Sequence, residues 1–354
     1  MRNHKVVLTR SLAGVPEPGD FRVVDEAVPE PAEGEFVVRH IYLSLDPYQR
    51  SAMAGRHMAG RQPLGAGAMP AAETLGRVFR SRHPAYAEGE YVRHFGGWQE
   101  YGLSTGERTE RVDPALAPLP AWLGVLGMPG LTAWASTVEL AGVHAGQTVL
   151  VSAALGPVGS LVGQLAIQRG AQAVGIAGSD EKCALVTREF GFRACVNYRR
   201  EGFLEALRAA LPDGADIYHD NVGGQMLADA FSVLKVNGTV ILCGLMERYN
   251  DPAKSKPLDL ALPILKRAVM KGLVVTDFEL RRPVFEAAVA AGIRAGQIRY
   301  REDRAEGIGQ AGAHFARLMR GENVGKALVV LAPDVAAEPV DKFLSFGVDL
   351  PNLG

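Results

Sequence analysis

Two hydrophobic patterns succeed each other along the chain. Up to about residue 120, short runs of apolar and polar residues lie between Gly- and Pro-rich turns, as is typical of β-strands. From about residue 121, apolar runs of strand length alternate with amphipathic stretches of helix length. After about residue 296 the character is mixed again, and the last expected strand is 326–332. The pattern predicts a β-rich beginning followed by an α/β domain.

In the β-rich part, the clearest expected strands are 36–45 and 74–81. Segment 56–72, between them, is too long and too rich in Gly for a simple hairpin, and loops of that kind are often functional. Segment 113–120, with its spaced prolines, is expected to be a connector.

In the α/β part, strands and helices are expected to alternate. Apolar runs rich in Val and Ile fit strands buried on both faces, and repeated strand–helix units imply a parallel, doubly wound sheet. The expected strands are 148–154, 172–178, 194–198, 215–222, 239–246 and 273–278. The expected helices are 157–170, 180–191, 201–211, 224–235 and 258–271.

Composition limits the classes of function and location. A length of 354 residues suggests about two domains, and a net charge of −1 excludes a global basic field for nucleic acid or an anionic membrane surface. No apolar stretch reaches about 18 residues and no signal peptide is recognisable, so no membrane span is expected. The widely spaced Cys183, Cys195 and Cys243 argue against a disulfide framework. A cytoplasmic protein is expected by elimination.

A glycine cluster follows the first strand of the α/β part. Gly156, Gly159 and Gly163 have the spacing GxxGxxxG between an expected strand and an expected helix, as in dinucleotide-binding sites. Gly156 is expected to form the tight turn, Gly159 to let the pyrophosphate approach the backbone, and Gly163 to let the helix pack on the sheet. The helix N-terminus then attracts phosphate. The alternative is a set of packing glycines with no ligand.

The end of the second strand bears on the choice of cofactor. An NAD site usually has an acidic residue there, but this chain has Gly178 and Ser179. Asp180 follows, and its simplest role is to cap the next helix. Lys182 is placed to meet the 2′-phosphate of NADP, although a solvated helix lysine is the other interpretation.

Several segments resemble one protein family. They are MPGLTAW (128–134), GPVGSLVGQLA (156–166), AGSDEKC (177–183), VNYR (196–199), DNVGG (220–224) and GENVGK (321–326). Together they resemble the zinc-independent medium-chain dehydrogenase/reductases, and within these the NADPH-dependent alkenal and prostaglandin double-bond reductases. GGWQEY (96–101) and LDPYQR (45–50) are similar to the bacterial curcumin-reductase-like branch.

The resemblance implies a GroES-like catalytic domain, made from 1–120 plus 296–335, and a Rossmann dinucleotide-binding domain at 121–295. Residues 336–354 would be a C-terminal tail. The resemblance also implies an active site between the domains and a homodimer joined through the nucleotide-binding domain.

The resemblance further implies which residues contact NADPH. Lys182 and Tyr198 would bind the adenosine 2′-phosphate side, Asn221 would contact the nicotinamide ribose, and Asn323 would close over the cofactor. For Tyr198 and Asn221, turn or strand-end structure is the alternative. The full set of expected cofactor contacts is Gly156, Val158, Gly159, Ser179, Lys182, Tyr198, Asn221, Cys243, Gly244 and Asn323.

No metal is expected. Related zinc enzymes need three or four Cys or His ligands at fixed spacing, but this chain has no Cys before Cys183. His57, His83 and His94 are scattered and are interpreted as surface or core histidines. Without a Lewis acid, reduction of an activated C=C bond is favoured over oxidation of a plain alcohol.

The expected reaction is hydride transfer from NADPH to the β-carbon of an enone or enal, followed by protonation of the enolate. Tyr249 and Tyr48 match family positions near the nicotinamide and are the candidate proton or hydrogen-bond donors, with packing aromatics as the alternative. Two other functions remain open: a quinone oxidoreductase on the same fold, and an NADPH-binding protein without turnover.

Overall fold

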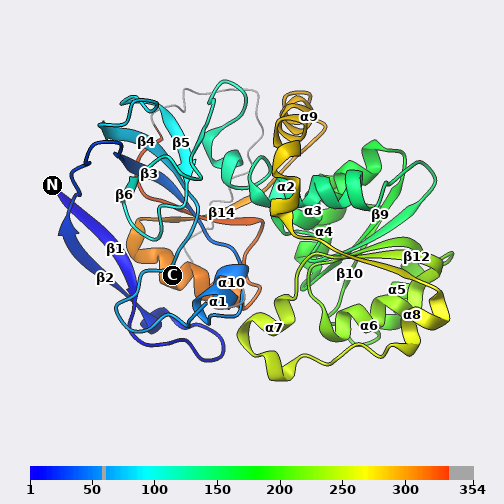
Figure 1. The fold of residues 1–354 in the computed structure, drawn as a ribbon. Coiled ribbons are helices and arrows are strands. Elements are labelled where there is room, and N and C mark those ends of the chain that lie inside the picture. The colour runs from blue at the N-terminus through cyan, green and yellow to red at the C-terminus, as the bar shows by residue number, and fades with distance from the viewer. Residues whose placement is uncertain (58–60, 335–354) are drawn as a thin grey trace. The chain divides into compact units, whose positions relative to one another are not determined.

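The chain forms two compact units in the computed structural model, which describes residues 1–57 and 61–334. One unit is Met1–Gly124 together with the described residues from Arg301 to Asp334, and the other is Val125–Tyr300 (Figure 1). The α/β unit is therefore inserted into the β-rich one. The tail expected at 336–354, and residues 58–60 of the expected long loop, lie outside the described part.

The first unit is built on a mixed sheet. Its strands are β1 (Arg2–Leu8), β2 (Phe21–Ala27), β3 (Phe36–Ser44), β4 (Thr74–Ser81), β5 (Tyr91–His94), β6 (Tyr101–Ser104), β7 (Glu110–Arg111), β14 (Glu302–Glu306) and β15 (Lys326–Val330). Its helical segments are η1 (Pro18–Asp20), α1 (Tyr48–Met53), η2 (Leu119–Leu123), η6 (Ile308–Gln310) and α10 (Ala311–Met319). The main sheet has the order β14-β15-β3-β4-β5-β7, with β6 also paired to β3, while β1 and β2 form a separate antiparallel pair.

Strand β3 organises this sheet because it is buried over almost its whole length. Phe36 and Val38 of β3 pack with Val78 of β4 and Val92 of β5, and Tyr86 covers this cluster. The strands expected at 36–45 and 74–81 are thus confirmed as β3 and β4. Beyond Ser44 the chain turns directly into α1, so the central strand positions the start of that helix.

The second unit is a parallel sheet with helical crossovers. Its strands are β8 (Thr148–Ser152), β9 (Gln172–Ala177), β10 (Ala194–Asn197), β11 (Ala215–Asp220), β12 (Leu234–Leu242) and β13 (Val269–Gly272). Its helices are α2 (Met128–Trp134), η3 (Ala135–Leu140), α3 (Pro157–Gln168), α4 (Asp180–Phe190), α5 (Phe203–Ala210), α6 (Gly224–Val233), α7 (Met246–Asn250), η4 (Pro252–Lys254), α8 (Ala261–Lys266), η5 (Val275–Arg281) and α9 (Arg282–Arg294).

The strand order β10-β9-β8-β11-β12-β13 confirms the doubly wound Rossmann arrangement. All pairs are parallel, so every strand ends at the same edge of the sheet. The direction of winding reverses between β8 and β11, and ligands of such sheets bind beyond the strand ends at that reversal. The core beneath it contains Leu150, Val174, Tyr218, Phe231 and Val240, all buried.

The last strand of this sheet was predicted in the wrong place. The expected helix 258–271 is only α8, and the expected strand 273–278 falls largely in the 3-10 helix η5, while the real strand is β13. Arg267 ends α8 in a left-handed conformation (φ 51°), which allows the chain to turn early into β13. Hydrophobicity was misleading because Val274 is 58% exposed in this chain, so its apolar character does not mark a buried strand.

No helix in the described ranges is both long and apolar enough to traverse a lipid bilayer.

Candidate active site

The turn from β8 into α3 depends on a residue that the sequence pattern did not single out. Ala153 has a left-handed backbone (φ 51°), whereas Gly156, expected to make the tight turn, is an extended N-cap (φ −68°, ψ 165°). Gly159 is needed for close approach, because a Cβ there would lie 2.5 Å from the carbonyl oxygen of Ala153. Pro157 lacks an N–H, so Val158 and Gly159 carry the first helix amides that can face an anion.

Gly163 has a packing role that differs from the expected one. A Cβ at Gly163 would lie 2.0 Å from Cζ of Phe192, so the glycine makes room for this ring rather than for the strands of the sheet. Phe192 lies between α4 and β10 and is buried. The glycine therefore sets the distance between α3 and the segment leading into β10.

The first turn of α4 carries the residues expected at the adenosine end. Its N-cap is Ser179, whose Oγ accepts the Lys182 N–H at 3.2 Å. Asp180 is not the cap: its carboxylate accepts a hydrogen bond from Nδ2 of Asn197 at 3.0 Å and forms an ion pair with Arg200. These two partners, Arg200 first, lower the pKa of Asp180. Its carboxylate is thus engaged within the protein.

Tyr198 stands beside this turn, at the end of β10. It is 42% exposed, and its ring carbon Cε1 would lie 3.3 Å from a Cβ built on Gly178, so a side chain there would press against the ring. The guanidinium of Arg199 lies 5.7 Å from the centre of the Tyr198 ring, and its Nε would lie 3.6 Å from the same Cβ. Sequence reasoning missed Arg199, although the basic residue directly after Tyr198 was a usable signal.

At the winding reversal, the side chain of Asn221 holds two strand ends together. Its Nδ2 donates to the carbonyl oxygen of Ser152 at 2.7 Å, and its Oδ1 accepts from Nε2 of His219 at 3.2 Å. Nδ1 of His219 lies 2.5 Å from Oγ of Ser136. Burial lowers the pKa of His219 to about 4, so the imidazole is neutral and Ser136 donates to it. The strand-end interpretation of Asn221 is therefore correct, and its contact with a cofactor stays a prediction.

Asp220, next to Asn221, is a buried carboxylate that sequence reasoning also missed. It accepts hydrogen bonds from the Tyr218 hydroxyl at 2.8 Å and from the N–H groups of Val222 and Gly223 at 3.0 and 3.1 Å. Burial raises its pKa, and these donors act in the opposite direction. Asp220 thereby fixes the Gly-rich turn that begins α6.

Tyr249 is brought next to two of the expected cofactor residues. A Cβ on Gly244 would lie 2.9 Å from the carbonyl oxygen of Asn221 and 3.5 Å from the Tyr249 hydroxyl, so the missing side chain lets these groups converge. The Leu245 N–H donates to that hydroxyl at 3.4 Å. Burial raises the pKa of Tyr249, which keeps the phenol protonated at neutral pH. Burial likewise raises the pKa of Cys243 to about 12, so its thiol is uncharged at neutral pH.

In the first unit, Tyr48 is the first residue of helix α1, and Lys326 holds the segment just before it in place. Nζ of Lys326, on β15, donates to Oδ1 of Asp46 at 2.5 Å and to the carbonyl oxygen of Leu45 at 2.9 Å, and both charged groups are buried. The ring of Tyr48 lies 4.8 Å from that of His57. Burial, followed by the charge of Asp46, raises the pKa of Tyr48, so this phenol is also protonated at neutral pH.

Asn323 has a local role in the described structure. Its Nδ2 donates to the carbonyl oxygen of Gly325 at 2.8 Å, and Gly325 itself has φ 97° and passes close to the backbone of Arg301. The amide thus stabilises the turn before β15. Its expected position over the cofactor stays a prediction.

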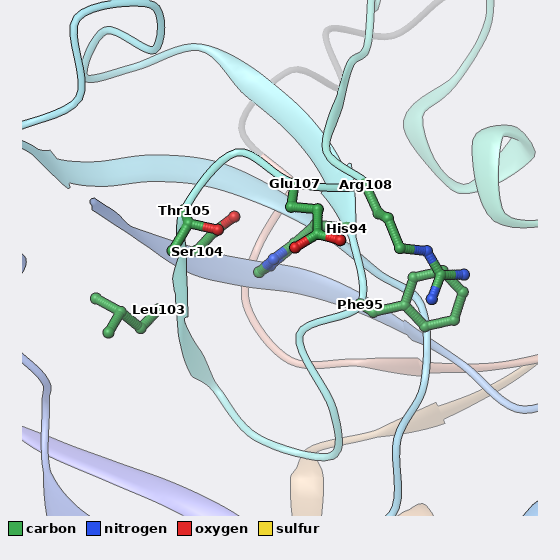
Figure 2. Close-up of a pocket in the computed structure, with 7 residues that line it drawn as sticks. All are labelled: His94, Phe95, Leu103, Ser104, Thr105, Glu107 and Arg108. Carbon is green, nitrogen blue, oxygen red and sulfur yellow. The ribbon is translucent and has the colours of Figure 1, made fainter. Parts of the chain in front are cut away.

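In the first unit, a cavity of about 290 Å³ lies beside the main sheet, at the end of β5 (Figure 2). It is lined by His94, Phe95, Leu103, Ser104, Thr105, Glu107 and Arg108. The guanidinium of Arg108 lies 4.0 Å from the centre of the Phe95 ring, and its charge lowers the pKa of Tyr48 against the larger effect of burial. None of the expected site residues lines this cavity, so we assign it no part in catalysis.

His94 is a buried core histidine that contacts a second histidine, His40. Of the two interpretations, surface or core, the second is therefore correct. Its Nε2 lies 2.8 Å from Nε2 of His40, and Nδ1 of His40 lies 2.7 Å from the carbonyl oxygen of Gln99. Since the carbonyl can only accept, His40 donates from Nδ1 and accepts the Nε2–H of His94. Burial lowers the pKa of His40 to about 4 and that of His94 well below its ordinary value, so both rings are neutral.

Comparison with known families covers both units. A model of the N-terminal domain of oxidoreductase matches residues 4–112, and a model of the zinc-binding dehydrogenase matches residues 157–291. The chain is 35% identical to the NADPH-dependent curcumin reductase of Escherichia coli over 94% of this chain and 98% of that protein. It belongs to the medium-chain dehydrogenase/reductases, in their double-bond reductase group.

Two further reductases and one solved structure are similar to the chain over nearly its whole length. The chain is 36% identical to a 2-alkenal reductase (NADP⁺-dependent) of Nicotiana tabacum, over 93% of this chain and 98% of that one. Prostaglandin reductase 1 of Bos taurus is 37% identical over 91% and 97%. The crystal structure of CurA from Vibrio vulnificus in complex with NADPH is 33% identical, has a TM-score of 0.87, and covers 94% of this chain and 100% of its own.

The description of the second family model mentions zinc, although this medium-chain dehydrogenase/reductase was expected to lack it. Among the described residues, no three His, Cys, Asp or Glu side chains are grouped so as to hold a metal ion. Freedom from zinc stays a prediction. Elemental analysis of active protein tests it, and stoichiometric zinc, or loss of activity on chelation, contradicts it.

Proposed function

We propose that the protein is an NADPH-dependent reductase of the C=C bond of α,β-unsaturated ketones and aldehydes. The names of its relatives support this reaction class: a curcumin reductase, a 2-alkenal reductase and a prostaglandin reductase, each at least 35% identical over nearly the whole chain. The observation that carries the proposal is the convergence of the protonated Tyr249 hydroxyl, Gly244 and Asn221 beyond the ends of β11 and β12. Ligands of doubly wound sheets bind at this edge.

The adenosine end supports NADPH rather than NADH. Lys182 and Arg199 supply cations just beyond the ends of β9 and β10, and the Tyr198 ring lies next to Gly178. The acidic residue that could bind a ribose 2′-hydroxyl, Asp180, is already engaged by Arg200 and Asn197. A phosphate dianion gains charge-assisted hydrogen bonds from such cations that a hydroxyl does not.

In the proposed mechanism, NADPH, when bound, would supply the hydride for the β-carbon of the substrate. Negative charge then grows on the substrate carbonyl oxygen, and the Tyr249 phenol donates a hydrogen bond to it. The Leu245 N–H orients that phenol, and the Asn221 network with Ser152 and His219 keeps the strand ends in place. Tyr48, fixed through Asp46 and Lys326, is the second candidate donor.

The deciding experiment measures NADPH oxidation by the purified protein against enals, enones, quinones and simple alcohols. We expect turnover with enals and enones, with a saturated carbonyl product, and none with simple alcohols. Turnover with quinones alone shows a quinone oxidoreductase instead. Tight NADPH binding without oxidation across the whole panel shows a binding protein.

We also propose that the protein forms a homodimer through the nucleotide-binding unit. Strand β13 is the last in the sheet order, so one of its edges carries no strand among those described. The sequence on either side of β13, from 260 to 284, carries large apolar side chains that are about half exposed or more: Leu260, Ile264, Leu265, Val269, Val274, Leu280 and Val284. An exposed strand edge with apolar surroundings is a site for pairing, and two-fold dimers are the commonest assembly.

A cytoplasmic location is part of the same proposal. It is supported by the three cysteines, which are all unpaired in the structure, as is usual in a reducing compartment. Cell fractionation with a tagged chain tests it, and recovery in a membrane or secreted fraction contradicts it.

A further inference from the structure

The histidine pair of the first unit leaves one ring nitrogen that can only accept a hydrogen bond. Nδ1–H of His40 is committed to the carbonyl oxygen of Gln99 at 2.7 Å, so its Nε2 accepts the Nε2–H of His94 at 2.8 Å. Nδ1 of His94 therefore carries no proton. Among the described residues, none donates a hydrogen bond to it. Buried polar groups normally have a partner, so a donor from outside the chain is expected at this nitrogen.

Two glycines make room for the pair of rings. A Cβ on Gly96 would lie 2.4 Å from Cε1 of His40. A Cβ on Gly102 would lie 2.8 Å from the same atom and 3.2 Å from Cε1 of His94. His94 is only 3% exposed, yet it lines the cavity at the end of β5. The part of its ring that the protein leaves uncovered therefore faces that cavity.

A turn with its own hydrogen bonds forms another wall of the cavity. Oγ of Ser104 lies 3.0 Å from Oγ1 of Thr109 and accepts the Gly106 N–H at 3.1 Å. The Thr109 N–H donates to the carbonyl oxygen of Gly106 at 3.2 Å, and the Tyr86 hydroxyl donates to the carbonyl oxygen of Thr109 at 2.9 Å. This wall is thus built into the fold.

The rest of the lining favours a neutral ligand with an apolar body. Phe95 and Leu103 are both exposed large apolar side chains, and Figure 2 shows them on opposite sides of His94. The lining also contains one carboxylate, on Glu107, and one guanidinium, on Arg108, whose charges cancel. An anion would meet the Glu107 carboxylate and the lone pair of His94, and a cation would meet Arg108.

A single aromatic ring with one hydroxyl donor meets these requirements. Pockets for drug-sized ligands span roughly 300–1,000 Å³, so this cavity of about 290 Å³ has the size for one small ring. We propose that the cavity binds a small neutral phenol, whose hydroxyl donates to Nδ1 of His94 and whose ring packs on Phe95 and Leu103. Such a site lies outside the set of residues proposed for catalysis and does not depend on the proposed function.

The test titrates the full-length protein with phenol, without NADPH, by isothermal titration calorimetry. We expect one site per chain. Anisole has the same ring but no donor, and it is expected to bind roughly ten-fold more weakly because Nδ1 of His94 then stays unpaired. Benzoate, an anion, is expected to bind no better than anisole.

Variants place the site in the cavity. Phe95→Ala removes an aromatic face at an exposed position and should weaken phenol binding roughly five-fold, while enone turnover stays unchanged. The matched control is Leu116→Ala, at an exposed leucine of the same unit outside the lining, which should keep the wild-type Kd. His94→Leu should lower the affinity for phenol to that for anisole. Where this buried substitution unfolds the protein, the phenol–anisole comparison and Phe95→Ala decide.

Other outcomes overturn the proposal. Equal affinities for phenol and anisole, tighter binding of benzoate, or no heat of binding each contradicts it, and the last means that water alone satisfies Nδ1 of His94. Phenol that competes with an enone and ignores Phe95→Ala occupies the substrate site instead. A protein that reduces no enone would disprove the proposed function, whereas the titration without NADPH still decides this site.

Discussion

At the scale of single residues, we expect Lys182 to decide the cofactor preference. Lys182→Ala removes a cation placed to meet the 2′-phosphate, and loss of a hydrogen bond to a charged group costs about 1.5–3 kcal/mol. The NADPH KM is therefore expected to rise roughly ten-fold, while the NADH KM stays almost unchanged. Steady-state kinetics with both cofactors measure this.

The matched control for this prediction is Arg188→Ala. Arg188 lies further along α4, is exposed, and pairs with Glu189, so the variant removes a positive charge from the same helix away from the phosphate site. It should leave both KM values unchanged. Equal losses with NADPH and NADH in Lys182→Ala would mean that the lysine does not read the phosphate and that Arg199 alone could do so.

The role of Tyr249 is tested by removing only its hydroxyl. Tyr249→Phe keeps the half-buried ring, so the loss should fall on kcat and leave the enone KM almost unchanged, because the hydrogen bond strengthens only as charge develops. We expect about a ten-fold lower kcat, less than for a single-donor oxyanion hole, since water or another hydroxyl can substitute.

The comparison variant is Tyr48→Phe. If it loses kcat while Tyr249→Phe does not, the two roles are reversed. Normal turnover in both single variants and in the double variant would show that solvent protonates the enolate.

At the scale of elements, sequence pattern was most successful where burial is strongest. Strands β3 and β8–β11 were placed within about two residues, because runs of Val and Ile there are buried by neighbours within the same unit. β13 and η5 were misplaced, since their apolar residues are exposed in the single chain. Pattern could not reveal that Ala153 takes the left-handed position of the turn, because spacing shows where glycines are and not which φ each adopts.

For the candidate site residues too, the sequence pattern indicates some positions and misses others. Ser179 was singled out because it follows a predicted strand, whereas Tyr198 and Gly244 came from the family resemblance, and the contacts of all three with NADPH stay predictions. Arg199 was missed although it directly follows Tyr198, and Asp220 was missed because its role depends on the conformation of the turn whose N–H groups it accepts. The His40–His94 pair joins β3 to β5, and no spacing rule would have linked two residues so far apart in sequence.

That pair makes stability depend on pH. The pKa of His40 is about 4 in the folded protein and near 6.5 when unfolded, so the unfolded state takes up the proton first. The stabilisation is complete above about pH 6.5 and is lost progressively as the pH falls toward 4, by about 2 kcal/mol at pH 5 for His40 alone. Urea unfolding between pH 7 and pH 5 measures this loss.

Variants separate this effect from the titration of carboxylates. A His40→Gln/His94→Gln double variant should show a shallower dependence of unfolding free energy on pH over that range, whatever its stability at pH 7. The exposed His144→Gln is the control and should keep the wild-type slope. Identical slopes in all three proteins would show that the buried pair does not govern acid sensitivity.

At the scale of the whole molecule, the proposed dimer predicts a concentration-dependent mass. Sedimentation at micromolar concentration should give twice the chain mass of 37.8 kDa. Leu280→Glu, at a side chain 95% exposed, should give a monomer because a charge in an apolar interface is costly. The control Leu103→Glu places the same charge on an exposed leucine of the first unit. A monomeric wild type, or dissociation by Leu103→Glu, contradicts the assignment.

The ion pair between Lys326 and Asp46 has a consequence for biosynthesis. The ribosome completes the inserted unit, residues 125–300, before it makes Lys326, yet the turn that carries Tyr48 needs this lysine to neutralise a buried carboxylate. Domains usually fold in the order in which they are translated. Here the N-terminal segment cannot complete its folding until Lys326 has been made. A chain stalled before β15 would therefore contain a folded nucleotide-binding unit and an incompletely folded first unit.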